Sequence, residues 1–188
     1  MNKLLFFLTF LVGCTSLNVP VNDVNLSEGS IIVNISEDVF DDVELSWFDT
    51  HLINVRTKES FAISDFSGKP VLLETFAVWC SKCLAQQNEI KKLHEELGDS
   101  FVSVTVDLDS SESEGKVLDF INGNGFSWVY SIDHNGFGKK LIDEFGINVA
   151  NAPNAPVILK CPGKDAELLR FGVKNLEELR SGVESCSV

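Results

Sequence analysis

The 188-residue sequence has few basic residues: 15 Lys and Arg stand against 28 Asp and Glu, for a formal net charge of −13. Sequence-independent binding to a phosphate backbone depends on clustered Lys and Arg. We therefore expect no nucleic-acid partner. Internal repeats and low-complexity tracts are also missing, and the length suits one ordinary domain plus a short additional segment.

Residues that commonly hold metals are scarce as well. The sequence has five Cys and three scattered His, and no second C-x-x-C or H-x-x-x-H accompanies Cys80 and Cys83. A zinc site built on this pair would lack its other two ligands. Leu84 follows the pair, whereas covalent haem attachment needs C-x-x-C-H. We expect no metal and no dissociable cofactor.

The N-terminus carries a short apolar run rather than a long one. Lys3 precedes nine apolar or near-apolar residues, 4–12, while a membrane-spanning helix needs about 20. We interpret residues 1–13 as an export signal. Residues 15–44 contain no Lys or Arg and are rich in Asp and Glu, so we interpret 14–44 as an acidic tether and 45–188 as the domain.

The last four residues of the apolar run, "LVGC", resemble the lipobox of secreted lipoproteins. The resemblance implies that Cys14 becomes the first mature residue and carries a lipid anchor. An ordinary cleaved signal with a chance cysteine is the alternative. With the anchor, the protein is expected at the cell membrane, facing outside the cytoplasm, where disulfides persist.

From residue 45 onward, short apolar runs alternate with amphipathic stretches. This alternation predicts an α/β fold with a central mixed sheet and helices on both faces, preceded by an N-terminal β-hairpin. The hairpin is expected from "HLINV" and "SFAI" around the turn "RTKE". Further strands are expected at "VLLETFAV", "FVSVTVDLD", "FSWVYSI", "PVILK" and "AELLRF", and helices at "LAQQNEIKKLHEELG", around 117–121, at "GKKLIDEFG" and at "NLEELRSGVES".

Cys80 and Cys83 stand where a predicted strand passes into a predicted helix. Free N–H groups and the positive dipole end at a helix start stabilise a thiolate at Cys80. Cys83, one turn further along, is expected to be shielded by the helix. This pattern predicts an exposed attacking sulfur and a protected one that resolves the mixed disulfide.

Glu74 interrupts the apolar strand six residues before Cys80. Period two places it on one face with Phe76 and Val78, so its carboxyl is expected to point inward beneath the helix start. Burial raises the pKa of a carboxyl, which suits it to exchange a proton near neutral pH, with Cys83 as its expected partner. A Glu at the sheet edge that reaches water is the alternative.

The segment "VLLETFAVWCSKC" resembles the active site of the thioredoxin superfamily, in the positions of Glu74, Trp79 and the two cysteines. With the upstream hairpin and the export signal, residues 45–185 look most like membrane-anchored thiol-disulfide oxidoreductases of the TlpA/ResA type. The resemblance implies a thioredoxin-like fold, Cys80 as nucleophile, Cys83 as resolving thiol and Glu74 as the acid that handles its proton. It further implies protein thiol or disulfide substrates, a membrane redox partner that recycles the pair, and a reductant role.

Members of this superfamily also carry a cis-proline opposite the cysteines, at the start of the next strand. Of the two prolines in "NAPNAPVILK", Pro156 matches this position better than Pro153. Trp79, Ala155 and Pro156 are then expected to shape the groove that docks a substrate. The departure from the pattern is "SK" between the cysteines, where many relatives have a proline second, and it leaves the redox potential open.

Two cysteines remain. In a thioredoxin-like layout, Cys161 and Cys186 lie at the same end of the domain, far from the active site. They either form a structural disulfide or remain two unpaired thiols.

Two other functions fit parts of the pattern. A copper-delivery protein of the same fold would add a distant His, for which His134 is the candidate. A thioredoxin-like module that binds proteins without exchanging disulfides would use the same groove.

Overall fold

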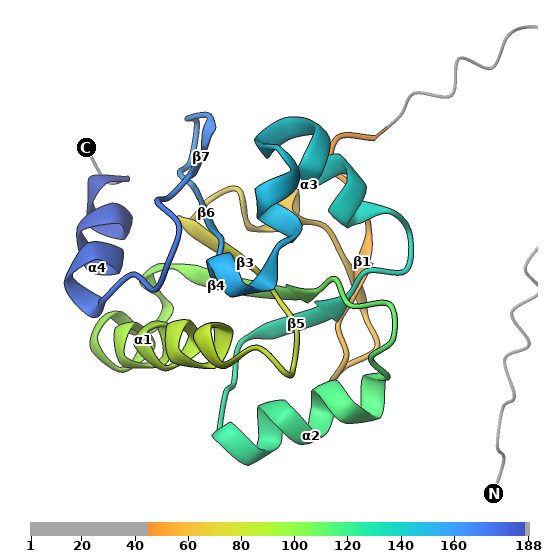
Figure 1. The fold of residues 1–188 in the computed structure, drawn as a ribbon. Helices are drawn as coiled ribbons and strands as arrows, with labels where there is room; N and C mark the ends of the chain where they lie inside the picture. Colours follow the sequence, from red (N-terminus) through yellow and green to blue (C-terminus); the bar gives the residue numbers. More distant parts are fainter. Residues whose placement is uncertain (1–44, 187–188) are drawn as a thin grey trace, which may run out of the picture. The chain divides into compact units, whose positions relative to one another are not determined.

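The computed structural model describes residues 45–186 (Figure 1). The predicted export signal (1–13), the predicted tether (14–44) and Cys14 lie outside the described residues, and so these interpretations stay predictions. Within residues 45–186, no helix combines the length and the apolar character needed to cross a membrane.

The centre of the fold is a five-stranded sheet with the order β5-β4-β3-β6-β7. Strands β3, β4 and β5 run parallel, whereas β6 pairs antiparallel with β3 and with β7, so the sheet is mixed as predicted. The strands of this sheet are β3 (Val71–Phe76), β4 (Val102–Asp107), β5 (Val129–Ile132), β6 (Val157–Lys160) and β7 (Ala166–Leu168). All six residues of β3 are buried, because the strand is central and both of its faces are covered.

Helices cover both faces of the sheet, as the alternating pattern predicted. The helices are α1 (Ser81–Leu97), α2 (Glu114–Asn124), α3 (Phe137–Phe145) and α4 (Leu176–Ser185), and the short 3-10 helices are η1 (Ile63–Phe66), η2 (Gly98–Ser100), η3 (Ile147–Ala150) and η4 (Ala152–Asn154). Figure 1 shows α1 and α2 on one side of the sheet and α3 on the other. One core cluster joins β3 to α1, α2 and α4, and a second joins its opposite face to α3 and η1.

The helix ends follow from local sequence. Gly98 ends α1 with φ at 55°, a left-handed value that glycine adopts without steric penalty. Asn175 caps α4: its side chain accepts from the N–H of Glu178, whose own carboxylate accepts from the N–H of Asn175.

The predicted N-terminal hairpin is a two-stranded antiparallel sheet of β1 (Leu52–Ile53) and β2 (Ser60–Phe61). The N–H of Val55 donates to the carbonyl of Tyr130 at 2.9 Å, which ties the hairpin to β5. Leu52 and Phe61 are buried in the cluster on the α3 face. The hairpin therefore closes that face of the sheet.

A disulfide joins Cys161, just after β6, to Cys186, at the end of α4, with their Cα atoms 5.1 Å apart. Of the two arrangements that the sequence left open, the structure has the bonded one. It closes a loop with a sequence separation of 25 residues. The bond lies at the opposite end of β6 from Ala155. Cys161 and Cys186 therefore do not compete with Cys80 and Cys83 for disulfide formation.

Candidate active site

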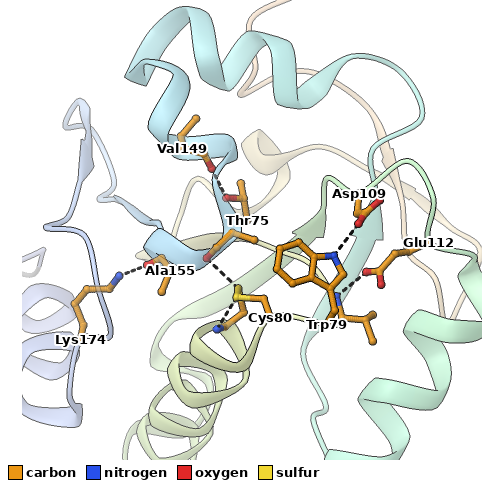
Figure 2. The surroundings of a disulfide bond; sticks show 11 residues. Thr75, Trp79, Cys80, Asp109, Glu112, Val149, Ala155 and Lys174 are labelled. Carbon is orange, nitrogen blue, oxygen red and sulfur yellow. Dashed lines mark hydrogen bonds between the residues drawn. A yellow bond between two sulfur atoms is a disulfide. The ribbon is translucent and has the colours of Figure 1, made fainter.

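Cys80 and Cys83 form a disulfide at the start of α1, with their Cα atoms 5.3 Å apart (Figure 2). Cys80 is the N-cap residue, in an extended conformation, and its sulfur lies 3.2 Å from the N–H of Cys83. A reduced sulfur at this position faces the positive end of the helix dipole and the free N–H groups of the first turn. Both stabilise a thiolate at Cys80.

The expected exposure of Cys80 is wrong for this disulfide-bonded form, in which Cys80 is 3% and Cys83 0% exposed. Both cysteines belong to a buried cluster that includes Ala152, from the segment of residues 150–155. The carbonyl oxygen of Ala152 lies 3.2 Å from the sulfur of Cys83, and both residues belong to the same buried cluster.

Glu74 points into the core, as the period-two argument predicted, and is completely buried. In β3 it pairs with Thr105 of β4 on one side and Val157 of β6 on the other. Burial raises the pKa of the Glu74 carboxyl well above its usual value, while the positive charge of Lys174 is the strongest influence that lowers it. Burial thus favours the protonated form of the Glu74 carboxyl.

The immediate surroundings of Glu74 are polar side chains that the sequence argument missed. Gln87 of α1 accepts a hydrogen bond from the hydroxyl of Tyr130 at 2.7 Å, and Thr105 accepts one from the indole of Trp128 at 2.9 Å. Gln87 and Thr105 also act to lower the pKa of Glu74, yet neither makes a hydrogen bond of ordinary geometry with its carboxyl oxygens. Within residues 45–186 the carboxyl has no such bond to Cys83 either, so the predicted proton transfer between them is not a direct contact in this form.

Trp79 is the exposed aromatic residue beside the disulfide, with 60% of its surface accessible. Its indole N–H donates to Asp109 at 2.8 Å (Figure 2). Hydrogen bonds from Ser111 and then from Trp79 lower the pKa of Asp109 to about 2, so this carboxylate is charged at neutral pH. The indole is therefore held in place beside a fixed negative charge.

Two further acidic residues, Asp107 at the end of β4 and Glu112 in the loop after it, lie at the same end of the sheet. Burial raises the pKa of Asp107 to about 7, the N–H of Asp109 opposes that rise, and the carboxyl of Glu112 adds to it. Glu112 accepts from the N–H of Val78 at 2.6 Å and pairs with Lys116 at 2.7 Å. The sequence held a signal for this cluster, because carboxyl ends of adjacent parallel strands meet at one edge of the sheet.

A groove of about 310 Å³ runs between Trp79 and residues 150–153. Pro153 lines this groove, whereas Pro156 is buried at the start of β6. All peptide bonds among residues 45–186 are trans, which contradicts the expectation of a cis bond at Pro156 or Pro153. Ala155 instead adopts a left-handed conformation with φ at 44°, and this conformation turns the chain before Pro156.

Lys174 is another residue that the sequence argument missed, a buried lysine between β7 and α4. Its ammonium donates to the carbonyl oxygen of Ala155 (Figure 2). In the sequence it stands just before a helix rich in charged residues, where a lysine is expected to be exposed to solvent. No pattern of spacing predicts its burial.

Within residues 45–186, no three His, Cys, Asp or Glu side chains form a group that could hold a metal ion. His134, the candidate for a copper site, belongs to a surface cavity beside Ile53 and Glu114 rather than to the groove next to the disulfide.

The model of the Redoxin family matches residues 51–159, which is more than half of the chain and includes Glu74, Cys80 and Cys83. The chain belongs to the Redoxin family.

Two curated relatives match as well. The thioredoxin-like protein YneN of Bacillus subtilis is 33% identical over 79 residues, which is 42% of this chain and 46% of the relative. An uncharacterized protein of Haemophilus influenzae is 30% identical over 101 residues, which is 52% and 61% respectively. The matches thus span about half the length of these relatives.

Solved structures show that this Redoxin-family chain has a thioredoxin-like fold. A secreted Mycobacterium tuberculosis disulfide oxidoreductase has a TM-score of 0.60 at 12% identity, covering 74% of this chain and 97% of its own. An electron transfer protein described as putative, from Aquifex aeolicus, has a TM-score of 0.61 at 19% identity, covering 74% and 94%. The thioredoxin domain of a thiol-disulfide oxidoreductase from Bacteroides vulgatus has a TM-score of 0.58 at 20% identity, covering 72% and 91%. Family and fold together support a thioredoxin-like oxidoreductase.

Proposed function

We propose that this chain is a thiol-disulfide oxidoreductase that exchanges the Cys80–Cys83 dithiol and disulfide with protein thiols, acting as a reductant outside the cytoplasm. The observation that carries the proposal is the disulfide itself, at the start of α1, with the buried carboxyl of Glu74 in the strand that leads into it. Family membership and fold support the same reaction class.

The reaction starts from the reduced pair. The Cys80 thiolate attacks one sulfur of a client disulfide, a mixed disulfide forms, and the other client sulfur leaves as a thiolate that takes up a proton. Cys83 then loses its proton, attacks the sulfur of Cys80 and releases the client as a dithiol. Two electrons pass from the pair to the client, and the product is the disulfide seen here.

Glu74 is the acceptor for the proton of Cys83 in this scheme. Its raised pKa fits it to take up and return a proton near neutral pH. Because no hydrogen bond joins the two groups in the disulfide-bonded form, a water molecule or a small movement of Cys83 has to connect them during the resolving step.

Trp79, Ala155 and Pro156 were expected to form the docking groove; Ala155 and Pro156 are buried and do not line it, so we assign docking to Trp79 with residues 150–153 of the segment 150–155. Trp79 is exposed on one wall and Pro153 lies on the other. An extended client chain in this groove would contact Trp79 and Ala152, the neighbours of Cys80 and Cys83.

Insulin reduction with a dithiol donor tests the activity. The wild-type protein is expected to catalyse it, Cys80→Ser is expected to abolish it, and Cys83→Ser is expected to trap a mixed disulfide at Cys80. The matched control replaces Cys161 and Cys186 by Ser and is expected to keep activity. A wild-type protein that binds clients but never reduces insulin would instead be a non-catalytic binding module.

The direction of electron flow is tested by the midpoint potential of the Cys80–Cys83 pair. A value near that of thioredoxin, about −270 mV, supports the reductant role, and a value near that of the oxidant DsbA, about −120 mV, contradicts it. A reductant outside the cytoplasm needs a membrane dithiol partner that returns two electrons to the pair after each turnover.

The anchored TlpA/ResA-like form is part of the proposal, and it rests on the sequence "LVGC" that ends in Cys14. Labelling with radioactive palmitate in a bacterial host is expected to mark the wild-type protein at the cell membrane. A Cys14→Ala variant is expected to lose both label and membrane association. Equal membrane association of the two variants contradicts lipid anchoring.

A further inference from the structure

Lys174 is a buried lysine whose position is fixed from the active-site helix. Its side chain is 1% exposed, and lysine is rarely buried so fully without partners. The side chain of Gln86, in α1, accepts from the N–H of Lys174 at 2.7 Å and donates to its carbonyl at 3.2 Å. The helix that begins at the disulfide therefore fixes the position of the Lys174 backbone.

The ammonium of Lys174 holds the segment that packs on the disulfide. It donates to the carbonyl oxygen of Ala155 (Figure 2). The N–H of Ala155 in turn donates to the carbonyl of Ala152 at 2.8 Å. The same carbonyl of Ala152 lies 3.2 Å from the sulfur of Cys83. A left-handed alanine persists only where its surroundings fix it, and Lys174 supplies one of those contacts.

The same ammonium acts on Glu74. Burial raises the pKa of Glu74, and the charge of Lys174 is the strongest influence in the opposite direction. The other groups that face Glu74 are uncharged at neutral pH: Gln87, Thr105 and Tyr130, whose own pKa is raised by burial and by Glu74. Among the groups that act on Glu74, Lys174 is thus the charged one that favours the carboxylate, against the larger effect of burial.

Lys174 in turn faces three charged groups. Burial lowers its pKa to about 8, while Glu74 counteracts that effect. Arg170 and Glu178 act on it with opposite signs, and they form an exposed ion pair with each other at 2.6 Å. At neutral pH the lysine therefore carries its charge between the docking segment and the buried acid.

We propose that Lys174 is a positioning residue of the redox centre, one ammonium that both holds Ala155 in the docking segment and supplies the positive charge that Glu74 needs as a proton acceptor. The inference rests on the proposed function, since it assigns a role within the step in which Cys83 resolves the mixed disulfide. It links the shape of the groove to proton transfer beneath it.

The test is the pH profile of that step. Reduced protein is mixed with oxidised glutathione; attack by Cys80 depends on the glutathione concentration, and resolution by Cys83 does not. Lys174→Met is expected to shift the profile of the concentration-independent phase upward by about one pH unit, so that this phase is about tenfold slower at pH 7. Lys174→Arg is expected to restore the wild-type profile, and Lys164→Met, an exposed lysine beside the far disulfide, is expected to leave it unchanged.

A double variant separates this role from a structural one. Glu74→Gln is expected to remove the ionisation from the profile, and adding Lys174→Met to it is then expected to cause no further shift. The inference is overturned if Lys174→Met leaves the profile unchanged, or if its shift persists in the Glu74→Gln background. If the wild-type protein does not react with oxidised glutathione or insulin at all, the proposed function fails instead.

A measurement on the wild-type protein covers the case in which Lys174→Met does not fold. Nitrogen-15 NMR of the Lys174 side chain in the reduced protein is expected to show an ammonium at pH 6, coupled to the carbonyl of Ala155. A neutral amine at pH 6, or an ammonium that exchanges as freely as that of Lys164, contradicts the proposal.

Discussion

Glu74 makes the stability of this protein depend on pH in a direction that can be calculated. The usual pKa of a glutamate is 4.5, and burial raises that of Glu74 well above it. Between these two values the unfolded chain has lost the proton and the folded chain keeps it. The free energy of unfolding therefore falls as the pH rises through this window, by up to about 1.4 kcal/mol per pH unit, and Glu74→Gln is expected to abolish that slope.

The assay is urea unfolding of the disulfide-bonded protein at pH 5, 6 and 7, followed by circular dichroism. The wild-type free energy minus that of Glu74→Gln is expected to fall from pH 5 to pH 6, by at most about 1.4 kcal/mol. Taking the difference cancels the similar contribution of Asp107, whose pKa is raised to about 7. Measurements stop below pH 8, where Lys174 starts to lose its charge.

A constant offset between the two proteins at every pH would refute this reasoning, because an amide that fits poorly changes stability without changing proton binding. Glu95→Gln is the matched control. Glu95 is exposed on α1, the same helix that carries Gln87, and its replacement is expected to leave the pH slope of the wild-type protein intact.

Three further changes test the packing around the site. Replacing Cys161 and Cys186 by Ser opens the 25-residue loop, and we expect a loss of about 3.5 kcal/mol in urea unfolding with insulin reduction retained; loss of activity in the folded variant would contradict the separation of the two disulfides. Tyr130→Phe leaves the buried oxygen of Gln87 without its donor and is expected to cost about 1–3 kcal/mol, so an unchanged midpoint would argue against that hydrogen bond. Leu93→Ala, on the completely buried face of α1, is expected to cost about 2–5 kcal/mol, and a cost under 1 kcal/mol would mean that this face is not packed as described.

For the segment from Glu74 to Gly98, local sequence patterns were sufficient to predict the structure. Period two placed the carboxyl inward, the strand-to-helix junction placed Cys80 at the helix cap, and glycine ended the helix at the expected position. Each of these features depends on residues within one or two turns of each other. The sequence therefore contained the information without any knowledge of the rest of the fold.

The docking segment could not be predicted in the same way. Whether Pro153 or Pro156 lines the groove depends on how the segment 150–155 packs against α1, and on a lysine about 20 residues later. The contact between Ala152 and Cys83 has the same origin, because it joins residues that are 69 positions apart. Local sequence cannot encode such contacts, which arise only when β6 pairs with β3.

The distribution of unfavourable features is itself an argument for where the chemistry takes place. The buried carboxyl of Glu74, the buried ammonium of Lys174 and the left-handed Ala155 each cost stability, and all three lie around the Cys80–Cys83 pair. On the opposite face of β3, beside Val71 and Leu73, the buried polar residue of the strand is Thr75, which is uncharged and donates to the carbonyl of Val149. A sheet packed solely for stability would have no reason to differ so much between its two faces. Selection for a proton acceptor and a fixed docking segment accounts for the difference, and it predicts that apolar replacement of Glu74 raises stability at neutral pH while slowing disulfide exchange.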